Sequence, residues 1–67
     1  MENSNIHFWS AELLKYRMRR CLTQRELAKM CGVSVNCIAR IERKENDSVS
    51  IKTAGKLMNA TGIKYDI

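Results

Sequence analysis

The stretch that decides the fold is "TQRELAKMCGVSVNCIARIER", residues 23–43. Thr23 followed three residues later by Glu26 is the pattern of a capping box, which begins a helix. Gly32 can take the left-handed backbone conformation that ends a helix, and Ser34 can cap the next one. The stretch therefore predicts two short helices joined by a tight turn, the second running from about residue 35 to residue 43.

The apolar residues of this stretch recur at helical spacing, so that both helices have an inward face. Inward positions are Leu27, Ala28, Ile38 and Ile41, with Val33 in the angle between the helices. The polar residues Asn36, Arg40 and Arg43 then point away from that packing face. This set of spacings is a helix-turn-helix, a motif whose second helix lies in the major groove of DNA.

The rest of the chain supplies further elements. A first helix is expected from a cap at Ser10 through residue 21, and a fourth from a cap at Ser50 to Gly62. "KENDSVS", residues 44–50, reads as a polar loop. "NIHF" at residues 5–8 and "IKYDI" at residues 63–67 alternate apolar and polar residues, which predicts short strands.

Length and charge favour a binding role over catalysis. A chain of 67 residues buries only about 60% of the surface of its unfolded form, which leaves little room for an active-site cavity. Its net charge of +5 attracts a polyanion such as nucleic acid, or an anionic membrane surface. Nothing in the sequence resembles a bilayer span or a signal peptide. We expect one soluble, cytoplasmic domain over residues 1–67, with residues 1–9 as an N-terminal arm.

Neither a metal site nor an active site is expected. Cys21, Cys31 and Cys37 form no C-x-x-C pair, and His7 is far from them in sequence, so we expect reduced, mostly buried thiols and no zinc. The sequence has no nucleophile and base at a useful spacing and no glycine-rich phosphate loop. It therefore predicts no enzyme and no cofactor.

The segment "YRMRRCLTQRELAKMCGVSVNCIARIE", residues 16–42, resembles the Xre or lambda-repressor-like regulators. Their usual pattern is "LR...GLTQ.ELA...GVS...I..IE", and the resemblance extends from Leu13 to about Ile63. It implies an all-α, lambda-repressor-like helix-turn-helix bundle of four or five short helices, with possible short terminal β-strands. It also implies binding to double-stranded DNA operators, usually as a dimer.

The resemblance implies particular roles for several residues, all within or close to the helix pair. The family's base-edge contacts fall on Val35, Asn36 and Arg40, and its phosphate contacts on Gln24, Ser34, Arg43 and Lys44. Asn suits an adenine edge, Arg suits guanine O6 and N7, and Val suits a thymine methyl. Arg17 and Glu42 match a buried salt bridge between the first and third helices. The alternative for each residue is ordinary solvated surface.

Three positions depart from the family pattern: Cys21 where glycine or another small polar residue is common, Lys44 where glycine is common, and Val49 where proline is common. Too few residues follow Gly62 for a fifth helix. The terminal strands are therefore candidates for a homodimer contact, with Ile63, Tyr65 and Ile67 on one face. The alternative is that the ends fold back on their own subunit, with Trp9 and Ile63 closing the core.

The sequence thus favours a sequence-specific regulator of transcription, most often a repressor in this family. Some antitoxins of the family end in a strand that pairs across a dimer, and "IKYDI" resembles that arrangement. The second reading is therefore an antitoxin or adaptor whose main partner is a protein, such as a toxin.

Overall fold

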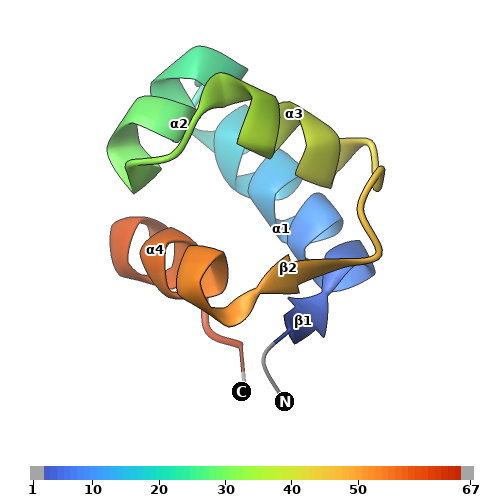
Figure 1. Ribbon diagram of the computed structural model, residues 1–67. Helices are drawn as coiled ribbons and strands as arrows, with labels where there is room; N and C mark the ends of the chain where they lie inside the picture. Colours follow the sequence, from blue (N-terminus) through green and yellow to red (C-terminus); the bar gives the residue numbers. More distant parts are fainter. Residues whose placement is uncertain (1–2, 66–67) are drawn as a thin grey trace.

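The structure, a computed structural model, describes residues 3–65. Its elements are β1 (Asn3–Asn5), α1 (Ile6–Arg19), α2 (Gln24–Cys31), α3 (Val35–Glu42), β2 (Ser48–Ser50) and α4 (Ile51–Thr61). α2 and α3 lie together at one end of the molecule, α4 and the two strands lie at the other, and α1 runs behind them (Figure 1). The prediction of a small helix-turn-helix bundle is confirmed, with four helices in the described part of the chain.

The predicted start of the first helix was wrong. α1 is capped by Asn5, whose side-chain oxygen accepts hydrogen bonds from the backbone amides of His7 at 2.8 Å and Phe8 at 3.3 Å. Ser10 is buried inside the helix, where its hydroxyl donates to the backbone carbonyl of Glu42 at 2.9 Å. Residues 6–9, expected as a strand and part of an arm, therefore form the first turn of α1.

α1, α2 and α3 end in the same hydrogen-bonded motif, in which one residue takes a left-handed conformation. The left-handed residues are Cys21 (φ 55°), Gly32 (φ 73°) and Lys44 (φ 58°). The amide of the next residue donates to a carbonyl five positions back, as in Leu22 to Arg17, Val33 to Ala28 and Glu45 to Arg40. Cys21 and Lys44 thus adopt the conformation for which glycine is the better residue.

A small antiparallel sheet joins the N-terminal strand to a segment that sequence reasoning took as loop. β1 pairs with β2 in the register Asn3↔Ser50, Ser4↔Val49 and Asn5↔Ser48. The hydroxyl of Ser4 donates to the Val49 carbonyl and accepts from the indole nitrogen of Trp9, each at 2.9 Å. The loop expected over residues 44–50 therefore ends at residue 47, and the segment after it closes one side of the core.

α4 has the predicted caps, but the residues after it do not form the predicted strand. Ser50 accepts from the amide of Thr53 at 3.2 Å, and Gly62 ends the helix with φ 78°. Residues 63–65 are irregular and unpaired, while residues 66–67 lie outside the described part of the chain. The C-terminal strand over residues 63–67 is thus not seen where the structure can show it.

Tyr65 packs instead on the N-terminal part of its own chain. Its ring centroid lies 4.8 Å from that of Phe8 and 6.1 Å from that of Trp9. Its hydroxyl accepts a hydrogen bond from the backbone amide of Asn5 at 3.0 Å. This matches the folded-back alternative, in which the end of the chain packs on its own subunit.

The core lies between the two ends of the bundle and holds α3 in place. The largest fully buried side chains come from all four helices: Trp9, Leu13, Leu27, Ile38, Ile41 and Leu57. Burying each aliphatic side chain of this kind stabilises the fold by about 1.5–3 kcal/mol. Because Ile38 and Ile41 are both in this core, α3 has only one face left to present to a partner.

Candidate nucleic-acid interface

The turn between α2 and α3 is fixed by its own hydrogen bonds. Left-handed Gly32 lets the amide of Val33 donate to the Ala28 carbonyl at 3.1 Å. Ser34 then caps α3 by accepting from the amide of Cys37 at 3.1 Å. Val33 is half-buried against the core. Because a backbone bond closes the turn on the α2 side and a side-chain cap closes it on the α3 side, α3 is held firmly with respect to α2.

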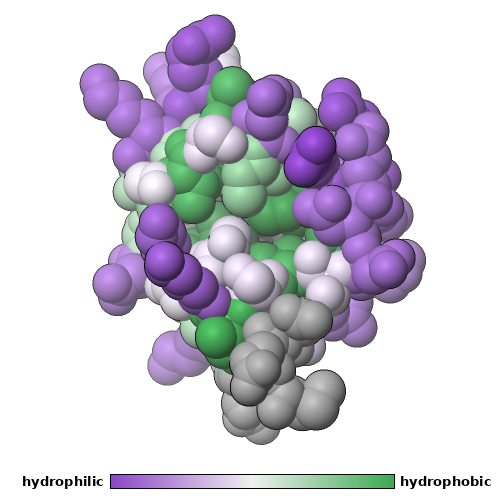
Figure 2. Space-filling view, viewed as in Figure 1, coloured by the Kyte–Doolittle hydropathy of each residue, from purple (hydrophilic) through white to green (hydrophobic). Residues whose placement is uncertain are grey.

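The outward face of α3 is polar and basic. Asn36 and Arg40 are exposed at a spacing of four residues, and Arg43, the residue that ends the helix, is exposed three residues later. Val35 is half-buried beside them. Figure 2 shows hydrophilic side chains gathered over the end of α3 and the loop after it, around an apolar area between α3 and α4. Of the predicted base contacts, Asn36 and Arg40 thus lie on the face of α3 that the core leaves open, whereas Val35 packs partly against the core.

The four residues predicted to contact phosphate lie in different local settings. Ser34 and Lys44 are exposed at the two ends of α3. Arg43 is exposed but pairs with Glu45, with 2.8 Å between Arg43 Nε and Glu45 Oε2. Gln24 is half-buried, and its amide nitrogen donates to Glu42 Oε1 at 3.0 Å. Two of the four are thus engaged by carboxylates of the same chain.

Glu42 is the centre of the polar cluster that joins α1, α2 and α3. Arg17 donates from Nε to Glu42 Oε2 and from Nη2 to Glu42 Oε1, each at 2.9 Å. Arg17 also donates from Nη1 to the Leu22 carbonyl at 3.2 Å, which ties the cluster to the segment before α2. A two-point arginine–carboxylate contact fixes direction as well as distance. The cluster therefore sets the position of the last turn of α3.

The charges of this cluster stabilise one another. Burial alone raises the pKa of Glu42, but hydrogen bonds from Arg17 and Gln24 and the charge of Arg17 outweigh it and hold that pKa below its ordinary value. The hydrogen bond to Glu42 raises the pKa of Arg17, against the opposing effect of burial. Both side chains are therefore charged at neutral pH.

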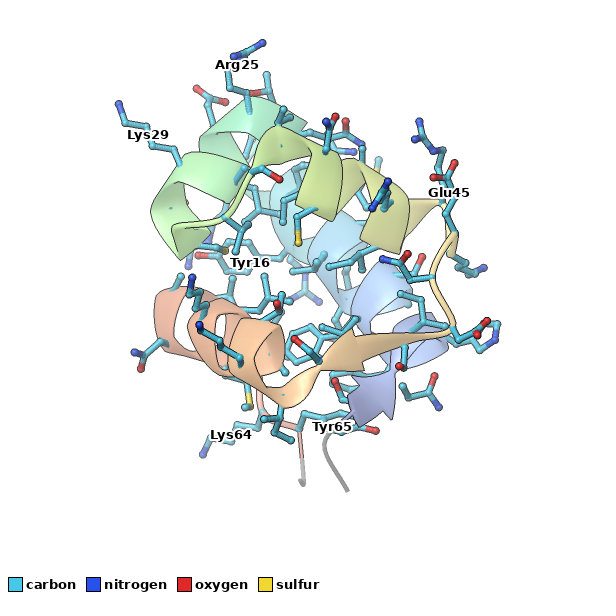
Figure 3. The ribbon with its side chains drawn as sticks, viewed as in Figure 1. Tyr16, Arg25, Lys29, Glu45, Lys64 and Tyr65 are labelled. Atoms are coloured by element: carbon cyan, nitrogen blue, oxygen red, sulfur yellow. The ribbon has the colours of Figure 1, made fainter. Side chains whose placement is uncertain are left out.

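Two features of this surface were missed by sequence reasoning. Glu45 projects from the turn after α3, where only basic contacts were expected (Figure 3). Arg25 and Lys29 project from α2 away from the body of the molecule and add positive charge near the helix pair (Figure 3). The acidic residue was readable in the sequence, because it follows Arg43 by two positions, but its ion pair depends on the left-handed turn between them.

The cysteines form no disulfide: Cys21 is exposed, Cys31 is buried and Cys37 is half-buried. Burial raises the pKa of the Cys31 thiol, and it raises that of Cys37 despite the nearby charges of Lys56 and Arg40. Both thiols are therefore protonated at neutral pH. Within residues 3–65, no three metal-ligating side chains come together, and no helix is long and apolar enough to cross a bilayer.

A wide, open hollow of about 550 Å³ is lined by α4 and the residues after it. A smaller cavity, of about 220 Å³, lies between α3, β2 and α4. Its lining is largely polar but uncharged, and consists of Cys37, Ile41, Asn46, Ser48, Val49, Ser50 and Thr53. Pockets for small-molecule ligands usually enclose about 300–1,000 Å³ and carry a few convergent polar groups. This cavity does not resemble an active site.

A short helix pair with a fixed turn, a buried inner face and a polar outer face is a DNA-binding helix-turn-helix unit. A sequence model described as "Helix-turn-helix" matches residues 13–67, most of the chain. The chain therefore belongs to this family of Xre- and lambda-repressor-like DNA-binding regulators, which is not a family of enzymes. Comparison with curated proteins and with solved structures gives no significant match.

Proposed function

We propose that the protein is a sequence-specific repressor of transcription that works in the cytoplasm as a dimer, with α3 in the major groove of double-stranded DNA. The observation that carries this proposal is the outward face of α3, on which Asn36, Arg40 and Arg43 are exposed while Ile38 and Ile41 are buried behind them. A polar helix face held from behind can enter a groove without losing its packing.

Three residues on or beside this face would read base edges. The amide of Asn36 can bond an adenine edge at two points, and the guanidinium of Arg40 can do the same with guanine O6 and N7. Val35, at the start of α3, can contact a thymine methyl. All three lie within two turns of the same helix, so that α3 alone would supply the base contacts in one half-site.

Contacts to backbone phosphates would flank these base-contacting residues and fix the position of α3 on the duplex. Ser34 and Lys44 are exposed at its two ends. Arg43 would contribute once it leaves Glu45, and Gln24 would approach the backbone from the start of α2. Since Gln24 and Arg17 both bond Glu42, contacts at α2 and at α3 would be positioned by one carboxylate.

The proposal of a dimer rests on the short length of DNA that one α3 can contact. α3 has eight residues, which span about 12 Å and reach only a few base pairs. A two-fold dimer reads two half-sites about one helical turn apart. Light scattering with and without a duplex would measure the mass of the protein, and two copies per duplex is the expected result.

The second candidate, an antitoxin or adaptor for a protein partner, is supported by Leu14 and Met18. They are four residues apart, on one face of α1, and are 41% and 68% exposed. Such a protein would hold a toxin or another partner on α1, and DNA binding would be secondary.

Selection from a pool of random-sequence duplexes separates these two candidates. A regulator should enrich a motif with two-fold symmetry and bind it far more tightly than the starting pool. Recovery of duplexes with no common sequence would contradict the regulator proposal and favour the partner-binding candidate.

A further inference from the structure

We infer that Glu45 limits the affinity of this protein for DNA by competing with a backbone phosphate for Arg43. The inference rests on the proposed function and assigns a residue that weakens the interface. Its basis is the ion pair in which Arg43 Nε lies 2.8 Å from Glu45 Oε2, with side chains 63% and 48% exposed. Glu45 thereby binds the guanidinium of Arg43, which would otherwise be available to a backbone phosphate.

Hydrogen bonds hold the backbone of both residues in this pair, which keeps their exposed side chains within reach of each other. The amide of Arg43 donates to the Ala39 carbonyl, and that of Glu45 donates to the Arg40 carbonyl, both at 3.0 Å. Lys44, between them, is held in the left-handed conformation that this motif requires. The Glu45 backbone therefore stays at the end of α3, and its side chain projects from the outer side of the turn (Figure 3).

A carboxylate at this position has two effects on a phosphate that approaches the end of α3. It repels the phosphate directly, and it must release Arg43 before Arg43 can bind the phosphate. An exposed ion pair changes an equilibrium by only about 1.4- to 5-fold, so Glu45 weakens DNA binding without abolishing it. The effect is sequence-independent, because backbone phosphates carry no sequence information.

The test compares Glu45→Gln with the unaltered protein, using fluorescence anisotropy of a labelled random-sequence duplex at several salt concentrations. Removing the carboxylate should tighten binding about two- to fivefold at low salt. It should also steepen the slope of log affinity against log salt by up to about 0.9 for each bound subunit, the value for one added phosphate contact.

Glu12→Gln is the matched control. It removes the same charge and also breaks an exposed ion pair, because Glu12 Oε2 lies 3.5 Å from Lys15 Nζ on α1. If net charge alone mattered, both variants would tighten binding equally, and the inference would be overturned.

Repeating the Glu45→Gln substitution in the Arg43→Gln variant shows whether the effect acts through Arg43. The gain from Glu45→Gln should largely disappear when it is added to Arg43→Gln, whereas an undiminished gain would contradict the competition. Circular dichroism checks that all variants are folded.

Failure of the unaltered protein to bind duplex at low salt would refute the proposed function itself, and the inference with it. Binding by the unaltered protein without a gain in Glu45→Gln would refute the inference alone.

Discussion

Arg17 of α1 donates two hydrogen bonds to Glu42 of α3, from Nε and from Nη2, each 2.9 Å from a different carboxylate oxygen. The Glu42 side chain is 8% exposed and that of Arg17 is 21% exposed. The contact falls on the last residue of α3, the helix that carries the proposed base contacts. The position of this helix therefore depends on a charge pair that is largely shielded from solvent.

Loss of one partner of this pair should be costly. We expect Glu42→Gln to lower the free energy of unfolding by about 3–5 kcal/mol, because Arg17 is left partly buried without its counter-charge. Urea unfolding followed by circular dichroism measures this loss. Glu12→Gln, at an exposed pair, should cost no more than about 1 kcal/mol. Similar small losses in both variants would show that the Arg17–Glu42 pair contributes little.

The same carboxylate should make stability depend on pH in the acid range. The pKa of Glu42 is lower in the folded protein than its ordinary value of 4.5, so its contribution is complete above that pH and is lost as the pH falls through the folded value. The difference in unfolding free energy between the unaltered protein and Glu42→Gln should therefore be largest near neutral pH. It should shrink below pH 4.5, and a difference that stays constant to pH 3 would refute this origin.

Lys44 should be replaceable with a gain in stability. Its φ of 58° costs a residue with a side chain about 1–2 kcal/mol, a cost that glycine avoids. Lys44→Gly should therefore raise the melting temperature by about 4–8 °C for a gain near 1 kcal/mol. Lys44→Ala, which removes the same charge but keeps the strain, should give no such gain. Equal melting temperatures for the two variants would exclude strain as the cause.

Arg40 and Lys44 should differ in the kind of binding they support. Arg40→Ala should cost about 1–3 kcal/mol on the selected duplex and relax the preference at one base pair. Lys44→Ala should weaken selected and random duplexes alike, since a phosphate contact is not sequence-specific. Anisotropy titrations on both duplexes measure these effects. If both substitutions weaken the two duplexes equally, Arg40 does not read a base.

The structural features that were predicted correctly depend on residues within a few positions of each other. The capping box needs only Thr23 and Glu26, and both of its hydrogen bonds are present, at 2.8 and 3.0 Å. Gly32 ends α2 for an equally local reason. The inward positions of Ile38 and Ile41 followed from helical spacing alone, and both are buried.

What the sequence did not predict depends on partners far along the chain. Serine is a common helix cap, but the hydroxyl of Ser10 donates a hydrogen bond to a carbonyl 32 positions away. The residue that caps α1 is Asn5. β2 has only three residues and exists because β1, about 45 positions earlier, pairs with it. Tyr65 alternates like a strand residue, but the aromatic rings of α1 offer it a packing site that no local pattern reveals.

The most direct test of the DNA-binding account is the affinity of the unaltered protein for a labelled duplex as a function of salt. Each phosphate neutralised by the protein contributes about 0.9 to the slope of log affinity against log salt. With Lys44 of two subunits engaged, we expect a slope of about −2 or steeper. Binding with no salt dependence, or no binding at low salt, would contradict the account.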